Sequence, residues 1–237
     1  MLGFCLHSLL REYGWQFFRH VALPHPVRTV KAFIDSGRYD LSGDAIATSD
    51  VEPDRSFGGP RSIVGVGFCL KPLDPPCLSG RSNHDCLYLE RLLHSETSNP
   101  PDCCRQCMIR EMGIMALKAG AAFYIMTSAK DILMDVFVPA LRAGRFSSGL
   151  FTLCRYSLRP FAVGLLASGI RGRMFSFEQG DCADYRTWLQ ADRGIKDEQT
   201  SLSEQNRVTI RGLLRDAAKE PDSNKRFKRQ GNILCPE

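Results

Sequence analysis

The sequence predicts an α/β fold, a mainly parallel wound sheet with helices on both faces, flanked by a helical N-terminal segment and a C-terminal helix. Two observations carry this prediction. Short apolar runs alternate with longer segments of helical spacing, and turn-forming residues bound each run. Alternation at this spacing is typical of right-handed crossovers between parallel strands. Apolar residues make up 43% of the 237 residues, which is enough for a sizeable core.

The elements follow in order along the middle of the chain. We expect buried strands at residues 62–69, 121–127, 148–154 and 173–177. Helices are expected near 87–96, 104–118, 129–144 and 159–169. Asp102 stands at the N-cap position of the second helix, Pro139 could kink the third, and Pro160 would open the fourth.

The flanking segments complete a division into three parts. Residues 1–60 are predicted to form two helices and a linker. Residues 61–200 would form an α/β cysteine-rich metal-binding domain. Residues 201–237 would form a helix with one apolar stripe, followed by a loosely held polar tail.

Charge and hydropathy narrow the function classes. The formal net charge of +5 is mild, and the basic residues are scattered except for Lys225, Arg226, Lys228 and Arg229, so nucleic acid is not an expected partner. No apolar run approaches the length of a membrane span, and the opening residues lack the features of an export signal. We therefore expect a cytoplasmic protein with no membrane partner.

Ten cysteines are high usage for a chain of this length. Cys5 and Cys235 stand alone near the ends and are expected to be ordinary free thiols. The other eight are the predicted metal ligands: Cys69, Cys77, Cys86, Cys103, Cys104, Cys107, Cys154 and Cys182. Because the cytosol keeps unligated thiols reduced, this density favours metal binding over a disulfide framework. Dithiol redox chemistry and buried structural cysteines remain alternatives, the latter above all for Cys154.

The predicted topology brings distant cysteines together. Cys69 and Cys154 close the first and third strands, and Cys182 follows the fourth by five residues. The carboxyl ends of parallel strands lie at one edge of the sheet, where ligands bind. The group from Cys103 to Cys107 would open a helix, and a helix N-terminus favours thiolates.

The ligand types limit the choice of metal. Thiolate sites suit zinc or iron–sulfur clusters. Zinc sites commonly use two close ligand pairs, whereas here only one exists, Cys104 with Cys107. Cluster ligands can come from distant loops, so an iron–sulfur cluster, 4Fe-4S in type, is the preferred prediction and zinc the alternative. Four ligands would leave spare thiols or allow a second cluster, and His84 could replace one thiolate.

Three polar residues near the same edge are candidates for holding a cofactor or an anionic substrate. Arg155 and Arg159 follow the third strand, and Asp181 precedes Cys182. Solvated side chains and helix-dipole partners are the alternative interpretations, for Asp184 as well. The chain contains no Walker loop, dinucleotide fingerprint, nucleophile elbow or H-E-x-x-H motif, so the common nucleotide and hydrolase chemistries lose support.

The order of these segments also resembles a known family. CLKPLDPPC is followed by the close cysteine group, then by AGAAFYIMTSAKDIL, GLFTLC and FEQGDCADYRTWL. From Cys69 to Leu189 this layout is similar to a cysteine-rich domain of unknown function, number one hundred and sixteen, found mostly in anaerobic bacteria and archaea. The resemblance implies an α/β fold and iron–sulfur binding, with seven of the eight cysteines, all but Cys86, at matching positions. The family supplies no established reaction.

The expected function is electron transfer, or reductive support of a partner enzyme, by an iron–sulfur protein. The sequence shows no acid–base or nucleophile set for self-contained catalysis. Two alternatives remain: a zinc-stabilised protein that binds a partner, and an enzyme whose cluster acts as a Lewis acid. In the enzyme alternative, Arg155, Arg159 or Asp181 would orient the substrate.

Overall fold

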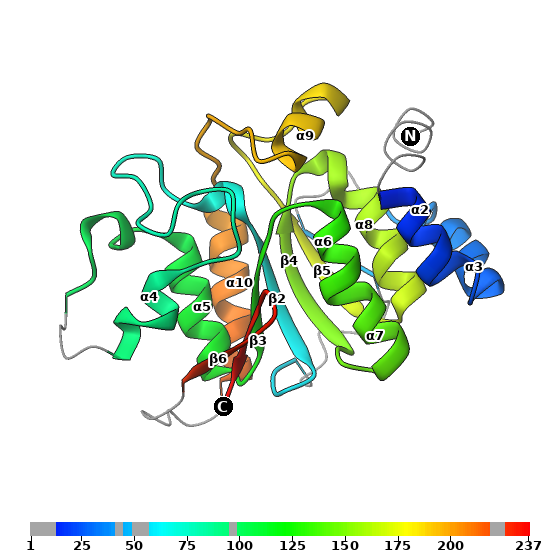
Figure 1. Ribbon diagram of the computed structural model, residues 1–237, viewed down its shortest axis with the longest axis horizontal. Helices are drawn as coiled ribbons and strands as arrows, with labels where there is room; N and C mark the ends of the chain where they lie inside the picture. Colours follow the sequence, from blue (N-terminus) through cyan, green and yellow to red (C-terminus); the bar gives the residue numbers. More distant parts are fainter. Residues whose placement is uncertain (1–12, 41–44, 49–56, 95–98, 219–225) are drawn as a thin grey trace.

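The computed structural model describes residues 13–40, 45–48, 57–94, 99–218 and 226–237. Its centre is a seven-stranded sheet in the order β1-β5-β4-β2-β3-β7-β6 (Figure 1). The strands are β1 (Ala45–Ala47), β2 (Ser62–Gly67), β3 (Ala122–Met126), β4 (Ser148–Leu153), β5 (Arg171–Ser176), β6 (Phe227–Gln230) and β7 (Ile233–Pro236). The four central strands pair in parallel, and the outer pairings are antiparallel. The predicted α/β class with a mainly parallel sheet is confirmed.

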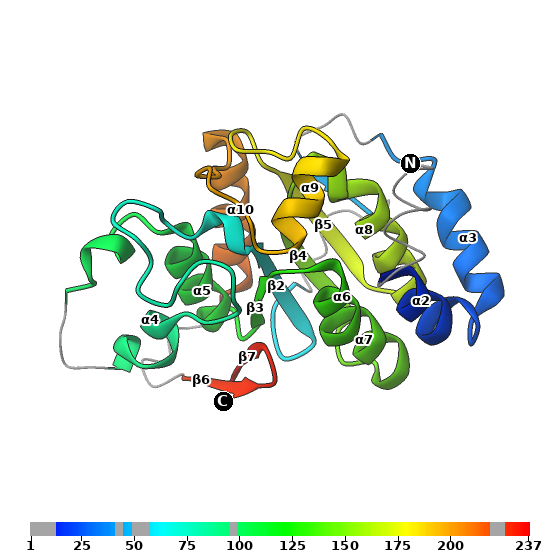
Figure 2. The same cartoon turned by 45° about the horizontal axis from the view of Figure 1, so that its top comes forward.

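Helices cover both faces of this sheet. On one face lie α2 (Tyr13–Phe17), α3 (Pro26–Ser36), α6 (Ala129–Ile132), α7 (Val138–Ala143) and α8 (Arg155–Ser168), with π-helical turns at Phe18–Ala22 and Leu133–Phe137. On the other lie α4 (Leu87–Glu90), α5 (Met108–Lys118) and α10 (Glu204–Ala217), with 3-10 turns at Phe68–Leu70, Leu92–His94 and Asp102–Cys104. The remaining helix, α9 (Tyr185–Asp192), lies across one end of the sheet beside α6 and α8 (Figure 2).

Alternating side chains of the central strands build the two cores. Ile63 of β2 packs in the core under α8, whereas its neighbour Val64 packs in the core under α5. In β4, Phe151 packs in the core under α8 and Leu150 in the core under α5. Because successive side chains of a strand point to opposite faces, a continuous apolar run serves a sheet that is covered on both sides.

The C-terminal residues differ from the loose tail that the sequence predicts. Residues 227–236 are not a loose tail but a hairpin, in which β7 pairs antiparallel with β3 and β6 pairs with β7. Gly231, with φ of +62°, and Asn232 form the two-residue turn between the strands. Glycine adopts positive φ without steric cost, so this pair is a hairpin signal in the sequence. The short strand β1 was also not predicted from the sequence.

Several element boundaries differ from the prediction. The first strand ends at Gly67, so Cys69 lies in a 3-10 turn rather than in the strand. The second helix begins at Met108 instead of residue 104, and Asp102 opens a separate 3-10 turn instead of capping it. Helix α8 begins five residues before Pro160, which is inside the helix. These shifts move the cysteines onto irregular backbone beside the sheet.

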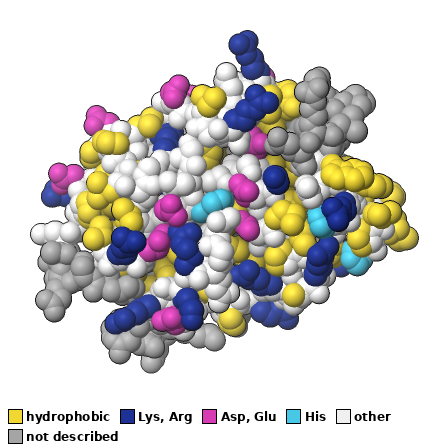
Figure 3. Space-filling view, viewed as in Figure 1, with side chains coloured by type: hydrophobic (Ala, Val, Ile, Leu, Met, Phe, Trp, Pro, Cys, Tyr) yellow, Lys and Arg dark blue, Asp and Glu magenta, His cyan; other side chains and the backbone are white. Residues whose placement is uncertain are grey.

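The N-terminal helices leave many apolar side chains exposed. Hydrophobic side chains gather over α2 and α3 on the face seen in Figure 3. The exposed ones in this part of the chain are Trp15, Phe18, Leu23, Val27, Val30, Phe33 and Ile34. Among the described residues, no helix has the length and apolar character needed to cross a membrane.

Candidate functional site: two groups of thiols

The eight predicted ligands separate into two groups that line different pockets. The loop thiol group consists of Cys77, Cys86, Cys103, Cys104 and Cys107; four of its members line one small pocket, and the fifth, Cys103, has its Sγ 3.7 Å from that of Cys104. The strand-end thiol group consists of Cys69, Cys154 and Cys182, which line a larger pocket. The two pockets have no lining residue in common. The expected meeting at one sheet edge therefore holds for the strand-end group alone.

Cys235 lines neither pocket. Cys235 lies in β7 and accepts a hydrogen bond from the Arg145 guanidinium at 3.5 Å. Cys5 lies outside the described residues. All nine cysteines that the structure describes are free thiols.

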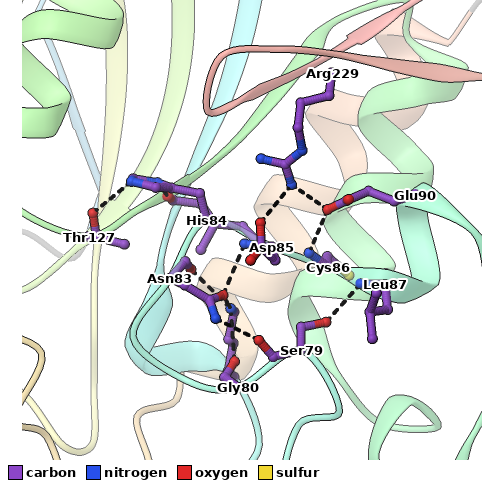
Figure 4. A network of polar contacts seen from close by, with 12 residues as sticks. Ser79, Gly80, Asn83, His84, Asp85, Cys86, Leu87, Glu90, Thr127 and Arg229 are labelled. Atoms are coloured by element: carbon purple, nitrogen blue, oxygen red, sulfur yellow. Dashed lines mark hydrogen bonds and ion pairs between the residues drawn. The ribbon is translucent and has the colours of Figure 1, made fainter.

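A buried lysine organises the loop that carries Cys77 and Cys86. Lys71 is only 1% exposed, and its ammonium donates to the carbonyl of Gly80 at 3.0 Å, to the carbonyl of Asn83 at 2.9 Å and to Asn83 Oδ1 at 2.5 Å. The same Oδ1 accepts the amide of Asp85 at 3.0 Å (Figure 4). A buried ammonium is costly unless it is hydrogen-bonded, so these three bonds fix the loop around it.

The C-terminal hairpin holds this loop from outside. Arg229 of β6 forms ion pairs with Asp85, at 3.0 Å, and with Glu90 of α4 (Figure 4). Glu90 in turn accepts the backbone amide of Cys86 at 3.0 Å. Two segments far apart in sequence thus position one thiol of the loop group.

The electrostatics of the loop thiol group favour neutral thiols in the metal-free protein. Burial raises the pKa of Cys86 and of Cys104 to about 12. Burial also raises the pKa of Cys107. Burial lowers the pKa of Lys71, whereas the negative charge of nearby thiolates would raise it. A metal that binds these sulfurs must displace their protons, and the ammonium of Lys71 would then offset part of the thiolate charge.

The strand-end thiol group forms a chain of hydrogen bonds. The indole of Trp188 donates to Ser157 Oγ at 2.8 Å, and that oxygen lies 2.9 Å from Cys154 Sγ. A hydrogen bond from Cys154 to Cys182 raises the pKa of Cys154 and lowers that of Cys182. Burial raises the pKa of Cys69 to about 11. Within this group Cys182 is the thiol that loses its proton most readily.

The predicted cofactor-binding residues are not in either pocket lining. Arg155, Arg159 and Asp181 line neither the loop pocket nor the strand-end pocket. The carboxylate of Asp181 instead accepts the backbone amides of Arg155, at 3.0 Å, and of Cys182, at 2.9 Å, and so caps the first turn of α8. Asp184 caps α9 in the same manner, through the amide of Thr187.

The predicted alternative ligand, His84, is engaged elsewhere. Its Nδ1 lies 2.7 Å from the carbonyl of Ile125, and its Nε2 lies 3.1 Å from Thr127 Oγ1 (Figure 4). Its ring also stacks on Tyr124. His84 could replace a thiolate only by giving up one of these partners.

Sequence reasoning missed two residues of these pockets, Lys71 and Lys196. Lys71 follows the first apolar strand directly, and its place two residues after Cys69 was the signal that could have found it. Lys196 lies in a polar stretch after α9, where nothing marks it as buried.

Neither the placement of the candidate ligands nor a comparison with known proteins identifies a metal or cofactor for this chain. Within the described ranges, no three Cys, His, Asp or Glu side chains are placed so that they could hold one metal ion. Comparisons with protein-family models, with curated proteins and with solved structures found no match. The resemblance to the cysteine-rich family therefore stays a prediction.

Proposed function

We propose that the protein binds an iron–sulfur cluster through the loop thiol group and serves electron transfer, or reductive support of a partner enzyme. One observation carries the proposal: two separate segments, one with Cys77 and Cys86 and the other with Cys104 and Cys107, line one pocket, with Cys103 beside them. Thiolates gathered from distant loops are typical cluster ligands. The proposal places the protein in the cytosol, where free thiols stay reduced.

The residues suit a cluster chemically and need to move to receive it. Five thiols exceed the four that a cluster requires, and Lys71 supplies a positive charge close to them. The empty space among the thiols is about 10 Å³, the room of one water molecule. Residues 71–86 must therefore shift outward on loading. A bound cluster would supply one-electron transfer, while the chain's own groups bind it, release the thiol protons and offset its charge.

The same small space favours zinc as the second candidate. A single ion needs far less room than a cluster, so the loop would have to move less for thiols of this group to close around it. Zinc would then stabilise the loop, and the protein would bind a partner instead of carrying electrons.

Metal analysis of protein purified without oxygen separates the two candidates. We expect iron and acid-labile sulfide in equal amounts, with a broad absorption band that bleaches with dithionite. The double variant Cys104→Ser/Cys107→Ser should lose most of the iron, whereas Cys235→Ser, outside both groups, should keep it. Stoichiometric zinc without sulfide would overturn the redox proposal in favour of the second candidate, and iron retained by the double variant would overturn the assignment to the loop group.

A further inference from the structure

The strand-end pocket is the larger of the two pockets described above. Its cavity volume is about 110 Å³, and it lies at the carboxyl ends of β2, β3, β4 and β5, where Trp188 and Ala191 of α9 form part of its wall. Apolar side chains make up most of its wall: Met126, Phe137, Leu153, Phe161, Phe177 and Trp188. A concave, mostly apolar cavity at this edge of a parallel sheet is where small ligands bind.

Lys196 is the cation in the wall of this cavity, and its ion pairing is weak; Asp192 is the acidic residue in the same wall. Lys196 has a side chain only 5% exposed, and the closest ion-pair distance of its Nζ is 3.9 Å, to the carboxylate of Glu198. Glu198 itself is 70% exposed, so water screens that pair. Asp181, Cys69 and Cys182 are its other charged or titratable neighbours.

The acidic side chains near Lys196 already accept hydrogen bonds from backbone amides. Asp181 accepts two backbone amides, and Asp192, which also lines the pocket, accepts the amide of Ala129 at 2.8 Å. No hydrogen bond joins the ammonium of Lys196 to another described residue, in contrast to the three bonds of Lys71. The Nζ of Lys196 is not among the fully buried atoms of the described residues that lack a hydrogen-bond partner, so the ammonium keeps contact with water, which a ligand anion could displace to pair with it.

We propose that the strand-end pocket binds a small monocarboxylate whose apolar body is one ring or a short alkyl chain. The carboxylate pairs with Lys196, and the body packs against aromatic side chains such as Phe161 and Phe177. The volume limits the size of the body: a cavity of about 150 Å³ takes up one benzene ring, so a cavity of about 110 Å³ admits no body larger than a single ring. This inference is independent of the cluster proposal, since it needs no metal and no thiolate.

The wall chemistry excludes more polar ligands. Phosphate esters carry nearly two charges and call for several donors, whereas Lys196 is the only cation among the described residues of the cavity wall and the acidic residue Asp192 also lines it. A neutral ligand of the same shape would leave the ammonium without its anion. The charge of the ligand should therefore change its affinity more than the details of its apolar body do.

Calorimetric titration of the full chain with phenylacetate and with phenylacetamide tests the proposal. The two probes share a ring and differ in charge. We expect phenylacetate to bind at least about tenfold more tightly than the amide. Lys196→Met should remove this preference and leave amide binding unchanged, whereas Lys196→Arg should keep part of it. Lys118→Met, an exposed lysine at the end of α5, is the matched control and should behave as the unaltered protein.

A second variant tests the location without touching the charge. Ala191 of α9 lines the pocket and is partly exposed, so Ala191→Trp should fill the cavity from the solvent side and abolish binding of both probes. Urea unfolding confirms that each variant is folded. Equal affinity for the two probes, no binding of phenylacetate at millimolar concentration, competition by inorganic phosphate, or undiminished phenylacetate binding by Lys196→Met would each overturn the proposal. Repeating the titration after chelator treatment separates it from the cluster proposal, because metal loss should not change these affinities.

Discussion

The two thiol groups each have a buried lysine beside them, yet the lysines differ in what they bind. In the loop thiol group, Lys71 gives three hydrogen bonds to backbone and side-chain oxygens. In the strand-end thiol group, Lys196 has one ion pair at 3.9 Å with an exposed carboxylate. The first ammonium holds a loop in place, and the second lies in a cavity wall without a hydrogen bond to another described residue.

The difference teaches that burial alone does not assign a role to a charged side chain. Both lysine side chains are largely buried, but the partners of Lys71 belong to the chain, so its charge is part of the folded structure. The surroundings of Lys196 are mainly apolar, and its best partner would come from outside. Hydrogen-bond satisfaction therefore separates a structural cation from a ligand-binding one.

Replacing each lysine by methionine should give the largest contrast. Lys71→Met leaves the carbonyls of Gly80 and Asn83 without this donor and removes one of the two bonds to Asn83 Oδ1, and we expect the free energy of unfolding to fall by about 3 kcal/mol. Lys196→Met removes one screened ion pair from an apolar wall, so the change should stay within about 1 kcal/mol. Urea unfolding monitored by circular dichroism measures both. Equal losses in the two variants would contradict the distinction between the lysines.

Alkaline pH should weaken the metal-free protein through its buried thiols. The pKa of Cys69 rises from 9.0 to about 11 on folding, so its thiol stays protonated in the folded chain after it ionises in the unfolded one. Stability from this group is complete below pH 9 and is lost as pH rises through 11, by about 3 kcal/mol. Cys86 and Cys104 act in the same direction.

The variant Cys69→Ser tests this pH dependence. Between pH 9 and 11 its free energy of unfolding should fall less steeply than that of the unaltered protein, when both are treated with chelator and kept reduced. Cys235→Ser, in β7 and outside both groups, serves as the control. A slope that Cys69→Ser leaves unchanged would show that this thiol does not titrate as described.

The smallest effect should come from the hairpin that holds the loop thiol group. Arg229→Met removes the pairs with Asp85 and Glu90, which are partly exposed, so the cost should be about 1 kcal/mol. Hydrogen exchange at the amide of Cys86 should accelerate because its acceptor, Glu90, loses its anchor. Arg145 contacts the same hairpin through Gln230, away from this loop, so Arg145→Met should leave the exchange rate of the Cys86 amide unchanged. Unchanged exchange in Arg229→Met would show that the hairpin does not position Cys86.

Local patterns in the sequence determined the fold class and most of the central elements. Apolar runs such as SIVGVG and AFYIM gave buried strands because both faces of a parallel sheet are covered, and helical spacing between them predicted the crossovers. The same patterns placed Cys69, Cys154 and Cys182 correctly at one sheet edge. Boundaries were less certain, since a proline such as Pro160 can lie inside a helix when tertiary packing compensates for its lost hydrogen bond.

The tertiary structure alone decided which cysteines meet and which cations lie among them. Spacing along the chain joined Cys103, Cys104 and Cys107, but the loop geometry added Cys77 and Cys86 and kept the strand-end thiols apart. The roles of Lys71 and Lys196 depend on long-range hydrogen bonds and on burial by distant segments, which no local pattern encodes. Sequence periodicity reports which face of an element is apolar, whereas a site depends on where several such elements come together in space.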